Sequence, residues 1–180
     1  LNNVLPNPAI FDTTKLLWMN GQYIRNIEED KFSKLAVQKI TSDITRDLFN
    51  SELERLHKIL PSVQERLETL NDLTPQIKFL LDEPFIIDQT DWENVNSEDG
   101  QQYLFRIREK FKNLEKFSLE NIENLMREEL KDMEIKPKVG FQITRVSITG
   151  TKISPPLFES IYALGKEGTV ARLAETIEKL

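Results

Sequence analysis

Residues 135–158 contain no acidic side chain, although the whole chain carries a formal net charge of −6. A local positive field, rather than the net charge, decides whether an anion can dock on a protein. The stretch includes the pair Ser154–Pro155, which is typical of a helix start with unpaired backbone N–H groups. Such groups can donate hydrogen bonds to a phosphate or to the edge of a base. We therefore expect an anion-binding surface here, with a capped helix beside ordinary lysines as the alternative. The basic residues of the stretch are Lys136, Lys138, Arg145 and Lys152.

No arrangement of residues typical of catalysis accompanies this stretch. The single histidine, His57, lies in an amphipathic helical pattern, and we interpret it as a surface or boundary residue. Adjacent carboxylates such as Glu128–Glu129 point about 100° apart on a helix, which is typical of a solvated face. The chain has no cysteine, no glycine-rich phosphate loop and no metal-ligand spacing. We expect no reaction and no metal site within it.

Composition favours a helical protein. The 180 residues are 39% hydrophobic, which is enough for one ordinary domain or two small ones. Straight-chain charged residues are abundant and only six glycines occur, so we expect an all-α fold. The longest apolar runs are too short to span a bilayer, and the absence of cysteine suits a cytoplasmic protein. The chain begins LNN without an initiator methionine, which suggests a fragment.

Helical stripes run through most of the chain. Asp12 is a predicted N-cap, and a later stripe over residues 53–60 is expected to break at Pro61. Proline, aspartate, asparagine and glycine cluster in residues 84–100, so we place a domain boundary near Ile87–Gln89, dividing 1–88 from 89–180. Two long amphipathic helices should follow, the second capped by Ser118.

The segment GFQITRVSIT at 140–149 is ambiguous between strand and helix. Its β-branched residues favour a strand slightly, although Phe141, Arg145 and Ile148 also fit one face of a helix. After Gly150, Ser154 is the predicted N-cap of a helix whose first residue is Pro155. That helix should end at Gly165, and a last amphipathic helix should complete the chain.

Two motifs resemble a known family. FDTTKLLWMNGQYIRN at 11–26 resembles a segment that follows the catalytic domain of bacterial-type glutamyl-tRNA synthetases, and RVSITGTKISPPLFESIYALGKEGTVARL at 145–173 resembles the signature near their carboxyl end. The resemblance implies the C-terminal part of such a class I aminoacyl-tRNA synthetase, with stem-contact-like helices followed by an α-helical anticodon-binding cage. It also implies that 139–149 is a helix. The family's His-x-Gly-His motif needs two histidines, so the catalytic domain, with its ATP and Mg²⁺, is not in this chain.

The resemblance also implies a partner and roles for individual residues. The partner is glutamate tRNA, read at its anticodon loop, by a chain that we expect to be monomeric and free of cofactors. Arg145 matches the arginine that approaches the anticodon bases, and Ser154, Pro155 and Leu157 match the loop and helix start around them. Pro156 stands where some relatives have glycine. Arg66 matches an arginine that some relatives use to recognise the last anticodon base and so reject glutamine tRNA, which favours a strict parent enzyme. Whether the parent enzyme also charges glutamine tRNA stays open.

These residue types suit recognition of unpaired bases, whose Watson–Crick edges are free. The planar donors of arginine fit base acceptors in a way that lysine cannot reproduce. Lys136, Lys138 and Lys152 could add phosphate contacts without sequence information. Leu157 could offer an apolar face to a base or lie in the helix core. Trp18 and Tyr23 could stack on RNA, but aromatic residues at helical spacing are more often core.

The sequence thus supports two hypotheses. The first is an anticodon-reading part of a glutamate–tRNA ligase, marked by the acid-free surface around Arg145. The second is a helical protein-interaction scaffold without an RNA role, which the net charge of −6 favours and which would show a sizeable exposed apolar patch.

Overall fold

The computed structural model describes residues 12–82, 84–87 and 95–180, and all regular structure in these ranges is helical. The all-α prediction is confirmed. The elements, in chain order, are α1 (Thr13–Arg25), α2 (Glu29–Ile44), α3 (Asn50–Gln64), η1 (Leu70–Asp72), α4 (Leu73–Ile77), η2 (Lys78–Leu80), α5 (Glu98–Asn113), α6 (Leu119–Asp132), α7 (Pro137–Thr149) and α8 (Leu157–Ile177).

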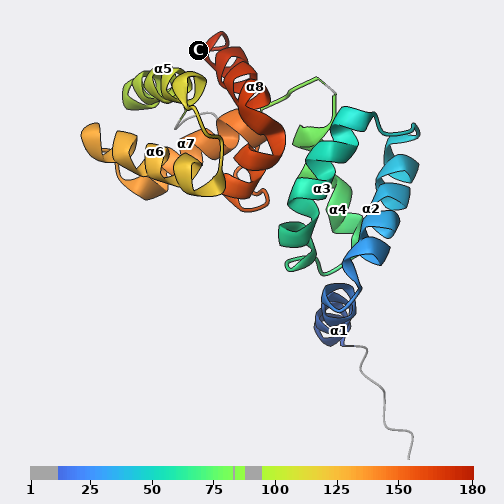
Figure 1. Ribbon diagram of the computed structural model, residues 1–180. Coiled ribbons are helices and arrows are strands. Elements are labelled where there is room, and N and C mark those ends of the chain that lie inside the picture. The colour runs from blue at the N-terminus through green and yellow to red at the C-terminus, as the bar shows by residue number, and fades with distance from the viewer. Residues whose placement is uncertain (1–11, 83, 88–94) are drawn as a thin grey trace, which may run out of the picture.

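The helices form two groups, one with α1 to α4 and one with α5 to α8 (Figure 1). Helix α8 contacts α5, α6 and α7 in its own group and α3 in the other, so it joins the two groups. Their buried side chains form one hydrophobic cluster, in which Leu56 and Ile59 of α3 belong with Ile161 and Leu164 of α8. The boundary predicted near residue 88 falls on residues 88–94, which lie outside the described ranges, and the division into 1–88 and 89–180 stays a prediction.

Two predicted helix caps are confirmed. The Asp12 carboxylate accepts a hydrogen bond from the Lys15 backbone N–H at 3.0 Å, and the Ser118 hydroxyl accepts one from the Asn121 N–H at 3.4 Å. Each satisfies a donor that the first turn of a helix leaves without a partner. The predicted helix end at Gly165 is also confirmed, because Gly165 has φ 82° and ψ 168° and interrupts the helical backbone of α8.

The predicted break at Pro61 is wrong. Helix α3 continues through Pro61 to Gln64. Proline cannot donate the helical hydrogen bond, which usually ends or kinks a helix. Here Leu60 and Val63, on either side of Pro61, are both buried, so tertiary packing keeps the chain helical.

Helix α1 differs from the others in its surroundings. It projects from the end of the first group (Figure 1), and Trp18 and Tyr23 remain 60% and 70% exposed. The prediction that these two aromatic residues lie in the core is therefore wrong. Within the described parts of the chain, no helix combines the length and the apolar character needed to cross a membrane.

Candidate nucleic-acid interface

Helix α7 carries the central residue of the predicted surface. Pro137 is the first helical residue, and the helix ends where Gly150 takes a left-handed conformation with φ 82°. The β-branched residues that favour a strand, Ile143, Val146 and Ile148, are at most 1% exposed. Burial against α5, α6 and α8 overrides their strand propensity. The strand interpretation of 143–149 is wrong, and the helix implied by the family resemblance is confirmed.

The less buried side of α7 bears the chemistry. Lys138, Phe141, Arg145 and Thr149 follow one another at steps of three or four residues, and none of them is fully buried. Lys138 precedes Arg145 by two turns, about 10 Å along the axis. Phe141 packs edge-on against Phe158 of α8, with ring centroids 5.4 Å apart. This line of residues therefore places a lysine and an arginine on one open strip.

Arg145 fastens the loop between α7 and α8. Its Nη1 donates to the Ser154 hydroxyl at 2.5 Å, to the Pro155 carbonyl at 2.8 Å and to the Ser154 carbonyl at 3.4 Å. Its Nε and Nη2 make no hydrogen bond with any described residue, and both atoms remain accessible to solvent. Half of the guanidinium thus shapes the loop, and the other half is available to a ligand.

No described carboxylate lies within ion-pair distance of Arg145. Burial lowers the pKa of the Arg145 guanidinium, and the nearby positive charge of Arg66 lowers this pKa further. An arginine nevertheless stays charged at neutral pH, because its ordinary pKa is far above 7. Arg145 is therefore a half-buried cation whose charge the described residues leave without a paired carboxylate.

Arg66 approaches this cation from the other group of helices. It is exposed, lies just beyond the end of α3, and its side chain makes no ion pair with a described residue. The two arginines are 79 positions apart in the chain, yet close enough for the charge of one to affect the pKa of the other. The positive charges of the two arginines repel each other, and a ligand rich in hydrogen-bond acceptors that binds both would offset this repulsion.

Ser154 and Pro155 do not start a helix. The N-cap of α8 is Pro156, and the first helical residue is Leu157. The Ser154 hydroxyl bonds to Arg145, and the Pro155 carbonyl also accepts from Arg145, so both residues are used to hold the loop. The prediction of a Ser154 cap with outward-pointing N–H groups there is wrong, because the Arg145 guanidinium competes for the same hydroxyl.

Leu157 is 5% exposed and belongs to the hydrophobic core. Of the two alternatives for this residue, the core position is the one that the structure has, and an apolar face offered to a base is not present in the free chain. Phe158, on the next position of the helix, is partly exposed instead. Two neighbouring helical residues point about 100° apart, so only one of them can face the core.

The three lysines surround the arginines loosely. Lys136 and Lys138 are exposed at the amino end of α7, and Lys152 is exposed on the loop that follows it. Lys152 already interacts with another group of the chain, so it is not a free cation. The acid-free stretch therefore spreads its charges along α7 and the loop, and the positive charge that lowers the pKa of Arg145 belongs to Arg66, from outside the stretch.

A cavity of about 210 Å³ opens beside the loop, where the two groups of helices meet. Thr149, Ile153 and Ser154 form one wall, and Phe79 and Phe85 contribute aromatic surface from the other side. Ile153 is 88% exposed at its rim. A hollow with aromatic walls and hydroxyl groups suits a flat, polar ring such as a base.

Arg172 is a residue of this cavity that the sequence predictions missed. Its guanidinium carbon lies 4.3 Å from the centre of the Phe85 ring, and its Nη2 donates to the Phe79 carbonyl at 3.3 Å. Burial lowers the pKa of Arg172, while Glu175 at 3.6 Å raises it. A signal existed, because Arg172 stands in the ARL sequence that closes the 145–173 motif.

Known proteins share this sequence and fold. A family model described as an anticodon binding domain matches residues 31–177. The glutamate–tRNA ligase of Cutibacterium acnes is 35% identical over 95% of the chain, and that of Symbiobacterium thermophilum is 32% identical over 97%. The chain spans 36% of the length of each of these relatives.

Solved structures show the same fold. A glutamate tRNA ligase from Elizabethkingia meningosepticum, crystallised in complex with its amino acid, superposes with a TM-score of 0.79 at 20% identity, covering 94% of this chain and 33% of that one. The glutamate-tRNA synthetase of Elizabethkingia anophelis gives a TM-score of 0.72 at 20% identity, covering 93% of this chain and 32% of that one.

Among the described residues, no group of three or more histidine, aspartate or glutamate side chains could hold a metal ion.

Proposed function

The chain belongs to the family of anticodon-binding domains, and from this membership we propose that it is the carboxyl-terminal part of a glutamate–tRNA ligase and reads the anticodon loop of glutamate tRNA. The longer ligase is called the parent protein below. Aminoacylation, with ATP and Mg²⁺, would take place in a part of the parent protein outside this chain. Similarity to glutamate–tRNA ligases over nearly the whole chain supports the proposal.

One observation carries the assignment of the site: Arg145 is half-buried, pairs with no described carboxylate, and has two nitrogens that make no hydrogen bond with a described residue. The positive charge of Arg66, from the other group of helices, lowers the pKa of Arg145, which supports including Arg66 in the site. Bases of an anticodon loop are unpaired, so their carbonyl and ring-nitrogen acceptors can meet the donors of a guanidinium. Phosphates of the loop can meet Lys136 and Lys138, which are exposed at the amino end of α7. Arg145 and Arg66 would supply specificity, and the lysines would supply salt-dependent affinity.

Arg66 provides the cleaner test, because the described residues give its side chain no structural hydrogen bond to lose. In a filter-binding assay with glutamate tRNA, Arg66→Gln should weaken binding by about 1–3 kcal/mol, roughly 5- to 150-fold. Lys34→Ala, which removes an exposed charge from α2, is the control for a loss of net charge and should change affinity much less. A tRNA altered at the last anticodon base should bind wild-type protein more weakly, and Arg66→Gln should reduce this discrimination.

Arg145→Lys separates charge from geometry. The lysine keeps one positive charge but lacks the planar set of donors, so we expect weaker binding by at least about tenfold. Because Arg145 also fastens the loop, thermal unfolding of the variant must be measured beside its affinity. Binding that is equal for all tRNAs, and equal in wild type and both arginine variants, would contradict the proposal and favour the protein-interaction scaffold.

The proposal includes a monomeric protein in the cytoplasm, where tRNA aminoacylation supplies translation. Light scattering after size-exclusion chromatography would give the mass of the chain in solution. A mass near 21.0 kDa is expected at all concentrations tested.

A further inference from the structure

One side of helix α1 packs against the first group of helices. Gly21 is buried and Ile24 is 4% exposed, and a side chain at position 21 would meet the Leu67 carbonyl at 3.1 Å. Gln64 donates to the carbonyls of Ile24 and Ile27 at 2.9 and 2.8 Å. The inner side of α1 is therefore fixed to the end of α3 and the residues just beyond it.

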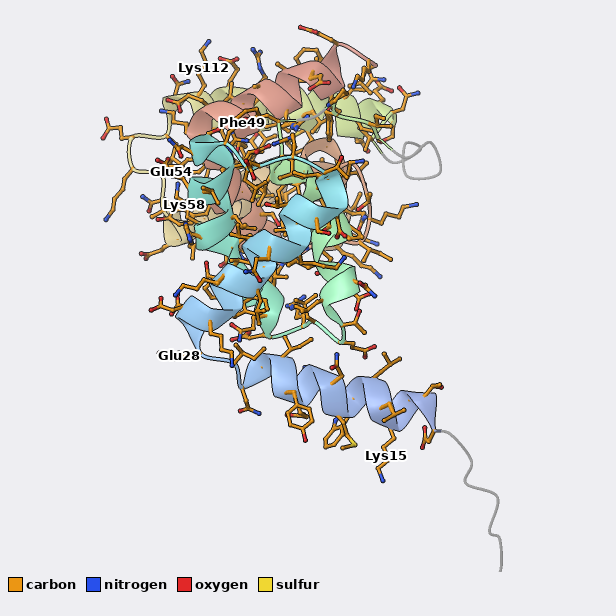
Figure 2. All side chains as sticks on the ribbon, turned by 90° about the vertical axis from the view of Figure 1, so that its right-hand side faces the viewer. Lys15, Glu28, Phe49, Glu54, Lys58 and Lys112 are labelled. Carbon is orange, nitrogen blue, oxygen red and sulfur yellow. The ribbon has the colours of Figure 1, made fainter. Side chains whose placement is uncertain are left out.

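The opposite side of α1 is apolar and exposed. Leu16, Met19 and Tyr23 follow one another at steps of three and four residues and form a stripe that is 44%, 36% and 70% exposed. On a helical wheel the stripe lies roughly 140° from the side of Gly21 and Ile24. Trp18, 60% exposed, lies between the two sides. Figure 2 shows α1 at the edge of the molecule, with Lys15 pointing away from the other helices.

A helix that is apolar on two sides is typical of one packed between two bodies. A helix on the surface of a finished protein would carry polar residues on its outer side. Helix α1 contains no acidic residue and only Lys15 and Arg25 as cations, so its outer side offers apolar contact rather than charge. Aliphatic side chains with few cations fit a protein surface better than RNA, which requires positive charge along its backbone.

We propose that the outer side of α1 (Leu16, Met19 and Tyr23) docks on the part of the parent protein that lies outside this chain. The occupant follows from the lengths: this chain spans 36% of each of two glutamate–tRNA ligases that resemble it, so most of such a protein is available to cover the stripe. The inference rests on the proposed function, because it takes a longer ligase as the parent protein.

The docking has a consequence for the candidate interface. The inner side of α1 holds the segment that carries Arg66: Asn20 donates to the Glu68 carbonyl at 2.5 Å, and Arg25 donates to the Glu65 carbonyl at 3.4 Å. These two bonds bracket Arg66 on both sides. A parent protein that fixes α1 from outside thereby also fixes the backbone from which Arg66 reaches the RNA.

The test compares two double variants of similar exposure. Leu16→Gln with Met19→Gln changes the outer side of α1, and Leu119→Gln with Val139→Gln changes residues that are 41% and 42% exposed in the other group. Glutamine keeps the helix propensity high. Hydrogen exchange by mass spectrometry is measured on the full-length parent protein and on the isolated chain. In the parent protein, we expect the α1 variant to speed exchange at residues 12–28 and 64–68 by about tenfold or more, whereas the control variant leaves these segments unchanged.

In the isolated chain, the α1 variant should exchange as wild type does, because the described residues leave the stripe exposed there. Equal exchange of the α1 variant and wild type in the parent protein would overturn the proposal. Loss of tRNA binding by the isolated α1 variant would assign the stripe to RNA, and loss of a concentration-dependent dimer would assign it to a second copy; either result also overturns it. Failure of the wild-type chain to bind tRNA would instead contradict the proposed function. The hydrogen-exchange result in the parent protein would still decide whether α1 docks there.

Discussion

Glu52 shows how a single carboxylate ties the first group of helices together. It is 1% exposed and accepts hydrogen bonds from both terminal nitrogens of Arg46 at 2.8 and 2.7 Å. The backbone N–H groups of Phe49 and Asp82 donate to it at 2.8 Å each. Four donors satisfy one buried charge, and the Arg46 bonds are the main reason that the pKa of Glu52 falls from 4.5 to about 2.

This lowered pKa predicts a dependence of stability on pH. A carboxylate with a depressed pKa in the folded state stabilises fully above its unfolded pKa, and the contribution is lost as the pH falls from 4.5 towards 2. Glu52→Gln should lower the free energy of unfolding at pH 7 by about 2 kcal/mol, the size of a hydrogen bond to a charged group. Urea unfolding between pH 2 and pH 7 would measure both effects. Glu54→Gln, at an exposed position of the same helix, should leave stability and its pH profile nearly unchanged.

Two hydroxyl groups buried on α7 should respond to removal in opposite ways. The Thr144 hydroxyl donates to the Gly140 carbonyl at 3.0 Å and lies 3.1 Å from the Tyr103 hydroxyl. The Ser147 hydroxyl is buried without a partner among the described residues. Thr144→Val should lower the free energy of unfolding by about 1 kcal/mol, and Ser147→Ala should leave it unchanged or raise it by up to about 1 kcal/mol. Chemical denaturation at 25 °C would compare them, and a large loss of stability in Ser147→Ala would contradict the expectation.

At the scale of elements, two glycines have the same φ but differ in ψ, which is −7° at Gly150 and 168° at Gly165. Gly150 and Gly165 both have φ 82°, a region that other residues rarely adopt. A side chain at Gly150 would meet the Ile86 carbonyl oxygen at 2.4 Å, whereas one at Gly165 would meet nothing within 4 Å. Gly165→Ala should therefore show the conformational term alone, about 1–3 kcal/mol. At Gly150 the clash with the Ile86 carbonyl adds to the conformational term of a left-handed residue, so Gly150→Ala should also lower the midpoint of thermal unfolding, measured by circular dichroism. A Gly150→Ala variant as stable as the wild type would mean that the Ile86 backbone moves aside freely.

The elements also show where sequence patterns succeed and fail. The caps at Asp12 and Ser118 are local, because a side chain and the N–H three residues later lie close in any helix. The fate of 143–149 is not local, since the same β-branched residues suit a strand until three other helices bury them. Pro61 likewise remains helical through tertiary packing. Where the conformation of a segment depends on packing against residues far away in the sequence, the local sequence pattern cannot predict it.

For the whole molecule, the continuous core predicts cooperative unfolding. Helix α8 packs on α3, and Arg172 and Lys179 of the carboxyl-terminal end donate to the carbonyls of Phe79 and Phe85. Differential scanning calorimetry should show one transition, with equal calorimetric and van't Hoff enthalpies. Arg172→Ala removes a bond and a ring contact at this junction and should lower the midpoint. Two separate transitions in the wild-type chain would show that the groups of helices unfold independently.

The candidate site was predictable in part. The family resemblance predicts Arg145 and Arg66 as site residues, and composition alone marks the acid-free stretch around Arg145. Their proximity was not predictable, because it arises from the packing of the two groups of helices. The roles of Ser154 and Pro155 were also beyond reach, since a cap and a hydrogen bond to a distant arginine need the same residue types.

The hydrogen bonds between Arg145 and the loop after α7 restrict where a ligand of this arginine can bind. The guanidinium can move only if it breaks its hydrogen bonds to the Ser154 hydroxyl and the Pro155 carbonyl. Breaking these bonds would disturb the wall of the neighbouring cavity. In the proposed interface, a base that binds the other nitrogens of Arg145 would meet a side chain that is already held in place, so little side-chain entropy would be lost on binding. A base that requires Arg145 to move would also break the hydrogen bonds that hold the cavity wall. The same few bonds would therefore favour a base that fits and disfavour one that does not.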